Sequence, residues 1–310
     1  MRLVADIGGT HARFALVGPD GQPGEVAKLK TADYPGPVEA ARAYLGDRTV
    51  DEAVFAVATP VESDWVELTN ACWAFSIRAT QEALGLRRLE VINDFVAQAL
   101  AVPALSAEER MKIGPGEPAA EAPIAVIGPG TGLGVAALVR IDGRWRPVAS
   151  EGGHVSMAPH DAVEAEILLR LRERFGHVSN ERVLSGPGLI NLATTLAEIA
   201  GDSLALDRPE DVSRRAAAGE CKHCAEALAR FSSLLGAAAG DLALTFLARG
   251  GVYIGGGLCK RLGPLFDGER FRAAFVAKGR FDRYLAAIPT YMVIRQDPGL
   301  LGAAAMHLPA

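Results

Sequence analysis

Cysteine is scarce in this sequence, and a long apolar run is lacking. Four of the 310 residues are cysteine, and only Cys221 and Cys224 have C-x-x-C spacing, so no second pair completes a zinc site. The pair lies in a segment with helical character, and we therefore expect ordinary thiols rather than a redox pair. The most apolar stretch, Phe231–Ala248, contains Asp241 and is too short and too rich in alanine and glycine to span a bilayer. It predicts a buried helix.

Charge of one sign is not concentrated anywhere in the chain. The formal net charge is −5, and neither a basic block nor a basic-aromatic segment is present, so we expect no nucleic-acid partner and no membrane partner. Asp6 interrupts the first apolar run, which argues against a signal peptide. Together with the cysteine pattern, these features predict a cytoplasmic protein.

Two familiar nucleotide-binding patterns are also missing. In a Rossmann fingerprint the glycine turn opens a helix, whereas Gly8-Gly9-Thr10 and Gly130-Thr131-Gly132 each lead from one short apolar run into another. A Walker loop needs Lys followed by Ser or Thr after its glycines, and neither turn has that pair. The two strand-to-strand turns therefore indicate a different fold.

The first hundred residues alternate between short apolar runs and helical periodicity. Three runs separated by turn residues predict a meander of strands, after which helices and strands alternate. The predicted strands are 3–7, 12–17, 26–29, 53–57 and 89–92, and the predicted helices are 37–44, 78–84 and 94–101. Asp94 is expected to cap the last of these helices. The loose segment 106–123, rich in Pro, Gly, Ala and Glu, is the best candidate for a domain crossing.

The order of elements then repeats. The predicted strands of the second half are 124–127, 133–139, 145–149, 252–254 and 291–294, and its predicted helices are 163–175, 189–200, 221–247 and 299–307. Asp142-Gly143 is typical of a hairpin turn between two of these strands. The sequence therefore predicts two βββαβα-like halves that face a cleft.

The two strand-to-strand turns are candidates for phosphate binding. In a tight glycine turn the backbone N–H groups can approach an anion closely, and the hydroxyls of Thr10 and Thr131 add donors. An ordinary glycine hairpin explains either turn alone equally well. Two such turns at matching places in two similar halves favour a nucleotide held between them. Asp6, just before the first turn, is suited to hold Mg²⁺ through water.

A third glycine motif, Gly255-Gly256-Gly257, follows a buried strand in the second half. Three glycines leave room for a ring or a ribose against the backbone. A simple helix-entry turn explains the motif equally well. The motif is therefore a candidate for binding the adenosine part of a nucleotide.

Polar residues with sugar-binding chemistry occur at three places. Asn93 can hydrogen-bond adjacent hydroxyls, and Asp94 can accept the proton of an attacking hydroxyl, although a plain helix cap explains Asp94 as well. Glu151 and Glu181 are strong acceptors for vicinal hydroxyls, and His154 can donate or accept. A structural histidine and a capping or surface glutamate remain the alternatives for His154 and Glu181.

Taken in order, these motifs identify a family. The chain resembles the bacterial glucokinases of the hexokinase and actin superfamily over essentially its whole length. The matching segments are VADIGGTHARF (4–14), LTNACWAFSI (68–77), VINDFVAQALAVP (91–103), GPGTGLG (128–134), EGGHVSMAP (151–159), HVSNERVLSGPGLINL (177–192), GGVYIGGG (250–257) and DPGLLG (297–302). One departure is His11, which stands where such proteins usually have Asn.

The resemblance implies an α/β fold with two ribonuclease H-like domains, the actin-like ATPase architecture, flanking a central cleft. A small domain would span 1–104, completed by 298–310, and a large domain 105–297. The implied activity is ATP-dependent phosphorylation of glucose at the 6-hydroxyl, the first step of glycolysis, by a homodimer that uses Mg²⁺. Asp94 would be the general base, and the implied glucose ligands are Asn93, Asp94, Glu151, His154 and Glu181. The implied nucleotide-binding residues are Asp6, Ile7, Gly8, Gly9, Thr10, Gly130, Thr131, Gly132, Gly255, Gly256 and Gly257.

Two other functions fit the same motifs. A kinase for another hexose, such as fructose or mannose, would keep the mechanism and change only the residues that bind hydroxyls. A catalytically silent sugar-binding sensor would keep those residues but would have no reason to keep Asp94.

Overall fold

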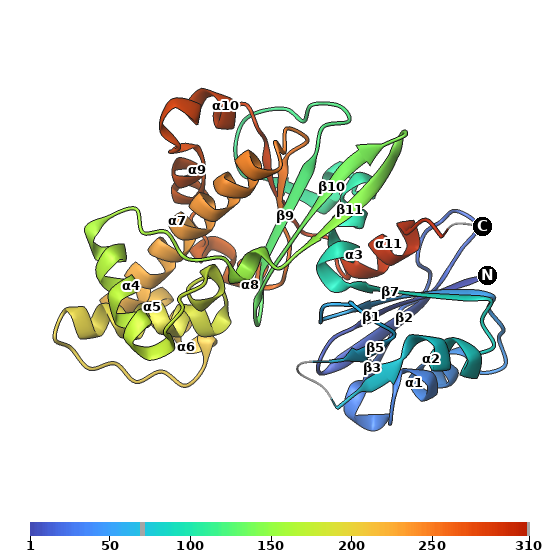
Figure 1. Ribbon diagram of the computed structural model, residues 1–310. Coiled ribbons are helices and arrows are strands. Elements are labelled where there is room, and N and C mark those ends of the chain that lie inside the picture. The colour runs from blue at the N-terminus through green and yellow to red at the C-terminus, as the bar shows by residue number, and fades with distance from the viewer. Residues whose placement is uncertain (69–71, 309–310) are drawn as a thin grey trace. The chain divides into compact units, whose positions relative to one another are not determined.

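The structure is a computed structural model that describes residues 1–68 and 72–308. The chain forms two compact units (Figure 1). Unit 1 comprises Met1–Ser106, Trp145–Ala149 and the C-terminal segment from Arg295, and unit 2 comprises Ala107–Arg144 and Ser150–Ile294. The predicted large domain, 105–297, included Trp145–Ala149, which the contacts place in unit 1.

Unit 1 is built on a five-stranded sheet with the order β3-β2-β1-β4-β7. Its first strand is antiparallel to β2 and parallel to β4, which in turn is parallel to β7. Helices α3 and α11 cover one face of the sheet, and α1 and α2 cover the other (Figure 1). The elements are β1 (Arg2–Ile7), β2 (His11–Val17), β3 (Ala27–Lys30), α1 (Pro37–Leu45), β4 (Glu52–Val57), α2 (Ile77–Ala83), β7 (Arg88–Asn93), α3 (Asp94–Ala101) and α11 (Pro298–Ala305).

The alternation of side chains along β1 separates a core from a polar site. Leu3, Ala5 and Ile7 are fully buried in the cluster that includes Phe14 and Phe55. Since side chains alternate across a strand, Asp6 points to the opposite face, the one that α3 and α11 cover. Unit 1 also contains two short antiparallel strands, β5 (Trp65–Glu67) and β6 (Ala74–Ser76). The sequence analysis did not predict these two strands. Residues 69–71 of the family segment 68–77 lie outside the described residues.

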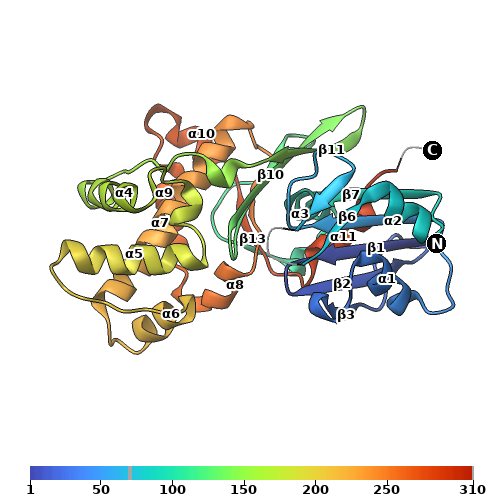
Figure 2. The ribbon, with the colours of Figure 1, turned by 60° about the horizontal axis from the view of Figure 1, so that its bottom comes forward.

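Unit 2 repeats the strand order of unit 1. Its six-stranded sheet has the order β11-β10-β9-β12-β13-β8, with β9 antiparallel to β10 and parallel to β12. The strands are β8 (Arg110–Lys112), β9 (Ile124–Pro129), β10 (Leu133–Ile141), β11 (Arg144–Ser150), β12 (Val252–Ile254) and β13 (Thr290–Val293). The helices, which Figure 2 shows from a second side, are α4 (Ala162–Phe175), α5 (Gly186–Ile199), α6 (Pro209–Ala217), α7 (Lys222–Thr245), α8 (Leu258–Leu262), α9 (Gly268–Val276) and α10 (Asp282–Ala286).

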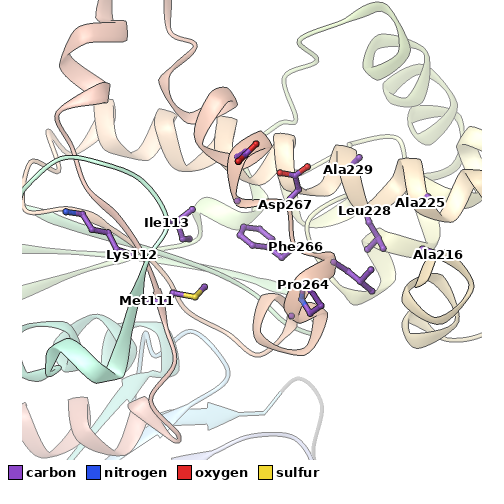
Figure 3. A pocket seen from close by; sticks show the side chains of 14 residues that line it. Met111, Lys112, Ile113, Ala216, Ala225, Leu228, Ala229, Pro264, Phe266 and Asp267 are labelled. Carbon is purple, nitrogen blue, oxygen red and sulfur yellow. The ribbon is translucent and has the colours of Figure 1, made fainter. Parts of the chain in front are cut away.

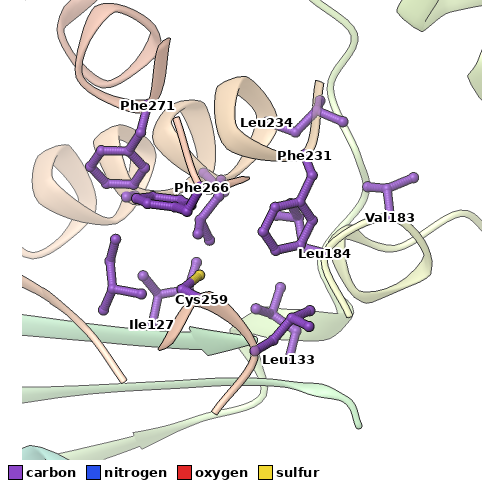
Figure 4. Close-up of a cluster of buried hydrophobic side chains, with 14 of the residues drawn as sticks. Ile127, Leu133, Val183, Leu184, Phe231, Leu234, Cys259, Phe266 and Phe271 are labelled. Carbon is purple, nitrogen blue, oxygen red and sulfur yellow. The ribbon is translucent and has the colours of Figure 1, made fainter. Parts of the chain in front are cut away.

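The core of unit 2 lies between its sheet and the long helix α7. Ile127 and Leu133 from the sheet face Phe231 and Leu234 of α7 (Figure 4). By length and composition α7 could cross a membrane, but 67% of its most apolar window is buried within the protein. The predicted buried helix is therefore confirmed.

The same core contains cysteines that test the prediction of ordinary thiols. Cys224 and Cys259 are buried, and burial raises the pKa of Cys224 to about 12. A thiol with so high a pKa has very little of the thiolate that redox exchange needs. The Cys221 thiol accepts the Cys224 N–H at 3.3 Å at the start of α7. These contacts support ordinary thiols.

Several local predictions hold and others need correction. Asp142 and Gly143 have φ of 50° and 72°, as a two-residue hairpin turn of the mirror-image type requires. The segment 106–123 is not wholly a loop, because β8 within it pairs with β13 at the sheet edge. The cap of α3 was predicted wrongly, because Asn93 is the N-cap residue and its side chain accepts the N–H groups of Phe95 and Val96, whereas Asp94 is already the first residue of the helix.

The close contact between α11 and α3 leaves no room for a side chain at position 302, and this can be tested. A Cβ at Gly302 would lie 1.6 Å from the carbonyl oxygen of Ala97. Although alanine normally favours a helix interior by about 1 kcal/mol over glycine, we expect Gly302→Ala to lower the free energy of unfolding by about 3 kcal/mol through overpacking. Urea unfolding followed by circular dichroism measures this change. The control is Ala305→Ser at an exposed position of the same helix, and an unchanged midpoint for Gly302→Ala would contradict the packing argument.

Candidate active site

Two carboxylates lie at one edge of the unit 1 sheet. In register, Ile7 of β1 is opposite Val57 of β4, and Val57 is opposite Asn93 of β7. The carboxyl ends of these parallel strands therefore meet at the same edge, and Asp6 and Asp94 stand at two of them. Both residues are half-buried. This edge is where open α/β sheets place their ligands.

Burial and nearby negative charge raise the pKa values of both carboxyl groups. Burial, opposed by the Arg13 guanidinium and reinforced by the Asp297 carboxylate, raises the pKa of Asp6 to about 6. Burial and then the charge of Asp6 raise the pKa of Asp94 to about 7, although the Phe95 N–H that it accepts lowers it. A carboxylate with a pKa near neutrality is suited to accept a proton at neutral pH.

An ion pair between Arg13 and Asp297 of the C-terminal segment lies beside Asp6. Arg13 Nε lies 2.7 Å from Asp297 Oδ1, and Asp297 has a left-handed backbone with φ of 48° just before α11. Two residues later, a Cβ at Gly299 would be 3.1 Å from Asp6 Cγ, so the glycine lets α11 begin directly against this carboxylate. Sequence reasoning did not select Arg13, Asp297 or Gly299 individually, although two of the matching family segments, 4–14 and 297–302, contain them.

Asn93 and Asp94 divide two tasks at the start of α3. Asn93 Oδ1 accepts the N–H groups of Phe95 at 2.8 Å and Val96 at 3.3 Å, and its Nδ2 donates to the Thr59 carbonyl at 3.3 Å. The Asp94 carboxylate accepts the Phe95 N–H on Oδ1 at 2.9 Å and a hydrogen bond from the Asn93 side chain, and both lower the pKa of Asp94.

The first glycine turn presents unpaired backbone donors. The Gly8 N–H closes the turn on the His11 carbonyl at 3.0 Å, and the Thr31 hydroxyl donates to the Gly9 carbonyl at 2.8 Å. No carbonyl within residues 1–68 or 72–308 accepts the Gly9 or Thr10 N–H. Two adjacent free N–H groups are what an anion-binding turn needs. His11 begins β2 opposite Lys30, and loss of hydration, followed by the charge of Lys28, lowers its pKa.

The second glycine turn, in unit 2, is tighter than the first. The Gly130 N–H donates to the Gly132 carbonyl at 2.8 Å, and Thr131 at its tip is exposed. Gly256 has φ of 70°, and a Cβ there would lie 2.5 Å from the Pro129 carbonyl oxygen. Because β9 and β12 are parallel neighbours, the motif Gly255–Gly257 and the Gly130–Gly132 turn lie together at one sheet edge.

The predicted sugar residues of unit 2 converge on Leu133, the first residue of β10. Glu181 Oε2 accepts the Leu133 N–H at 2.8 Å. A Cβ at Gly153 would lie 1.9 Å from the Leu133 carbonyl oxygen, so the short helix Gly152–His154 packs on the same residue. His154 Nε2 is 3.9 Å from Glu151 Oε2, and both side chains are more than half exposed.

Two chain segments hold this arrangement in place. The Met157 N–H donates to the Val178 carbonyl and the Asn180 N–H to the Val155 carbonyl, each at 2.9 Å. The His177 ring lies 3.0 Å from the His154 carbonyl oxygen. The segment after His154 and the segment before Glu181 are therefore paired, which brings together residues that the sequence separates.

Two pockets of unit 2 differ in their relation to these residues. A pocket of about 660 Å³ is lined by apolar side chains that include Ile113, Leu228 and Phe266 (Figure 3). Among the described residues, its lining contains none of the predicted site residues. A smaller pocket of about 210 Å³ is lined by Gly152, Val155 and other neighbours of the predicted sugar residues. The size of a pocket therefore does not identify the candidate site, and the functional groups of the predicted residues do.

The fit of Mg²⁺ can be judged from the acidic residues. Among residues 1–68 and 72–308, no group of three or more His, Cys, Asp or Glu side chains could hold a metal ion directly. Asp6 instead offers one half-buried carboxylate beside two others that repel it. A hydrated Mg²⁺, which keeps several waters and binds one or two carboxylates, fits this arrangement.

Two α/β units with one strand order, with a glycine turn after β1 in unit 1 and after β9 in unit 2, are typical of a sugar kinase of the actin-like ATPase fold, and known proteins agree. The family model for glucokinase matches residues 3–309. A glucokinase from Paramagnetospirillum magneticum is 49% identical over 99% of this chain and 97% of its own. A glucokinase crystal structure from an Antarctic psychrotroph superposes with a TM-score of 0.90 at 38% identity, covering 98% of this chain and 97% of that one. The chain belongs to the glucokinase family, and it is an enzyme.

A more distant structure supports the fold alone. A ROK family glucokinase from Streptomyces griseus, solved in complex with glucose and AMPPNP, has a TM-score of 0.66 and 21% identity. It covers 98% of this chain and 97% of its own. The predicted fold class and family resemblance are confirmed by these comparisons.

The raised pKa of Asp94 predicts the pH dependence of the reaction. As the pH falls through about 7, Asp94 becomes protonated and can no longer accept a proton. At glucose and ATP concentrations well below KM, which report the ligand-free enzyme, we expect the rate to fall about tenfold per pH unit on the acid side. Asp6→Asn removes a charge that raises this pKa, so the inflection should move to lower pH.

The control for this profile is Asp47→Asn at an exposed position of unit 1. We expect its inflection to coincide with that of the unsubstituted enzyme. A rate that stays constant from roughly pH 5.5 to 8, the range in which a carboxyl with a pKa near 7 titrates, would exclude Asp94 as the titrating base.

Proposed function

We propose that the protein transfers the terminal phosphoryl group of ATP to the 6-hydroxyl of glucose, with Asp94 as general base. The observation that carries the proposal is the Asp94 carboxyl, which has a pKa of about 7 and lies at the carboxyl end of the parallel strands. In phosphoryl transfer the protein mainly positions the reactants and stabilises charge. It also supplies a base that accepts the hydroxyl proton as the new O–P bond forms.

Glucose is proposed to bind through five side chains. Asn93 donates an amide hydrogen, Asp94 receives the proton of the 6-hydroxyl, and Glu151, His154 and Glu181 bind the other hydroxyls. Exposed Glu151 and His154 in unit 2 have the acceptor and donor capacity for this role. Charged acceptors form the stronger hydrogen bonds to neutral donors.

ATP is proposed to bind through the glycine motifs of both units. The free N–H groups of Gly9 and Thr10 in one turn, and those of Thr131 and Gly132 in the other, would hold phosphate oxygens. Gly255–Gly257 would lie against the adenosine. Asp6 would hold Mg²⁺ through water, and the ion when bound neutralises phosphate charge. The central cleft, the homodimer and the cytoplasmic location stay predictions.

Substrate selectivity separates this proposal from its first alternative. A kinase for mannose or fructose would use the same base, so only the hydroxyl-binding residues differ. Turnover compared among glucose, mannose, fructose and N-acetylglucosamine decides between them, and a higher kcat/KM for another hexose would overturn the assignment to glucose. A silent sensor would bind sugar and show no turnover.

Removal of the base carboxylate gives the most direct test. Asp94→Asn keeps a side chain of the same size, so we expect the fold and most of the glucose affinity to persist while kcat falls by about 10²- to 10⁴-fold, the usual contribution of a positioned base. Steady-state kinetics and calorimetric glucose titration measure the two effects. Asp47→Asn is the matched control, and a kcat within a few-fold of the parent would show that Asp94 is not the base.

Removal of one charge from the sugar site should spare the nucleotide. Glu151→Gln weakens a hydrogen bond to a charged acceptor, worth about 1.5–3 kcal/mol, and we expect the glucose dissociation constant to rise by about 10- to 100-fold. The affinity for AMPPNP, titrated alone, should remain near that of the parent. Glu173→Gln at an exposed position of α4 is the control. Loss of AMPPNP affinity with unchanged glucose affinity would reverse the assignment.

A further inference from the structure

The carboxylate of Glu181 contacts the second glycine turn instead of standing free for a ligand. Its Oε2 accepts the N–H of Leu133 at 2.8 Å, immediately after the Gly130–Gly132 turn. It also fills the space beside Gly132, where a Cβ would lie 2.5 Å from Oε2. The sequence predicted Glu181 as a sugar ligand, with a capping or surface glutamate as the alternative, and did not predict this contact with the turn.

A second hydrogen bond ties the same segment to the other end of the turn. The Gly186 N–H donates to the Gly130 carbonyl at 2.9 Å. Between the two contacts, the Ser185 hydroxyl donates to the Glu181 carbonyl at 2.8 Å and accepts the Gly188 N–H at 3.0 Å. The segment Glu181–Gly186 is therefore internally braced and holds the turn at both ends.

We propose that Glu181 is a positioning residue that couples glucose binding to the shape of the phosphate-binding turn. The proposal rests on the function proposed above, in which Glu181 binds a sugar hydroxyl. A carboxylate has two oxygens, so Oε2 fixes the turn through Leu133 while Oε1 is available to glucose. A sugar that fixes Glu181 thereby fixes the turn, and the nucleotide then meets a turn that is already ordered. By linkage, nucleotide improves glucose affinity by the same factor.

Gly132→Ala tests the coupling without changing Glu181 itself. The new methyl group would meet only the far end of a flexible side chain, and Gly132 has no left-handed backbone that would oppose a side chain. The variant should therefore fold and displace the carboxylate. Glu173→Ala is the control for loss of a glutamate side chain, because Glu173 is exposed on α4 and has no assigned role.

The measured quantity is the ratio of AMPPNP dissociation constants without and with saturating glucose, obtained by calorimetry on the full chain. We expect AMPPNP to bind the parent at least several-fold more tightly when glucose is present. Gly132→Ala and Glu181→Ala should reduce this ratio at least threefold. Glu181→Gln keeps an acceptor for the Leu133 N–H, so it should retain the ratio better than Glu181→Ala while weakening glucose binding. Glu173→Ala should keep the parent's ratio.

Two outcomes separate this inference from the proposed function. If Glu181→Ala weakens glucose binding but leaves the ratio at the parent value, Glu181 is a sugar ligand and the coupling is wrong. If neither Glu181→Ala nor Glu181→Gln changes glucose affinity, the sugar assignment of Glu181 in the proposed function is wrong, and the coupling that rests on it is wrong too. Circular dichroism spectra that match the parent exclude misfolding as the cause.

Discussion

A reversal of three residues follows β1 in unit 1 and β9 in unit 2, and the rest of the candidate site depends on it. In such a tight turn between antiparallel strands, successive N–H groups point outward without a partner in the ladder. Each turn lies at the carboxyl end of parallel strands, next to Asp6 in unit 1 and next to Gly255–Gly257 in unit 2. The turn geometry thus supplies anion donors, and the parallel strands place other functional groups beside them.

The unit 1 site combines charge and burial in a way that costs stability. Asp6, Asp94 and Asp297 repel one another, and Arg13 is the cation that the Asp6 carboxylate interacts with most strongly. Burial of a carboxylate disfavours its charged form, so the pKa values rise. The same rise gives Asp94 a proton affinity suited to a base at neutral pH. Helix α11 maintains this environment by packing through Gly302 on α3 and by bringing Asp297 to Arg13.

The unit 2 site is organised by one backbone position rather than by charge. Leu133 receives Glu181 on its N–H, and Gly153 packs against its carbonyl. Because Leu133 directly follows the Gly130–Gly132 turn, a shift of the segments that hold Glu181 and Gly153 also affects the turn. A kinase that uses this contact can make its nucleotide site depend on its sugar site without a separate regulatory element.

The sequence by itself determined the order of elements, the glycine turns and the family. These are local properties, because hydrophobic periodicity and turn chemistry are set by neighbours in the chain. The repeated strand order, the buried helix in 221–247 and the hairpin turn at Asp142 were all predictable on this basis. Asp6 and Asp94 could be selected as candidates because they lie at the ends of strands, next to a glycine turn and a helix start.

Only the tertiary structure decided which of these residues touch and what surrounds them. Asn93 rather than Asp94 caps α3, because the direction in which the chain enters the helix, and not residue type, selects the cap. The short strand β8 forms because the edge of β13 offers it backbone partners. The pairing of Arg13 with Asp297 and of Glu181 with Leu133 joins segments far apart in the chain. Such contacts arise from packing and strand register, which no local pattern encodes.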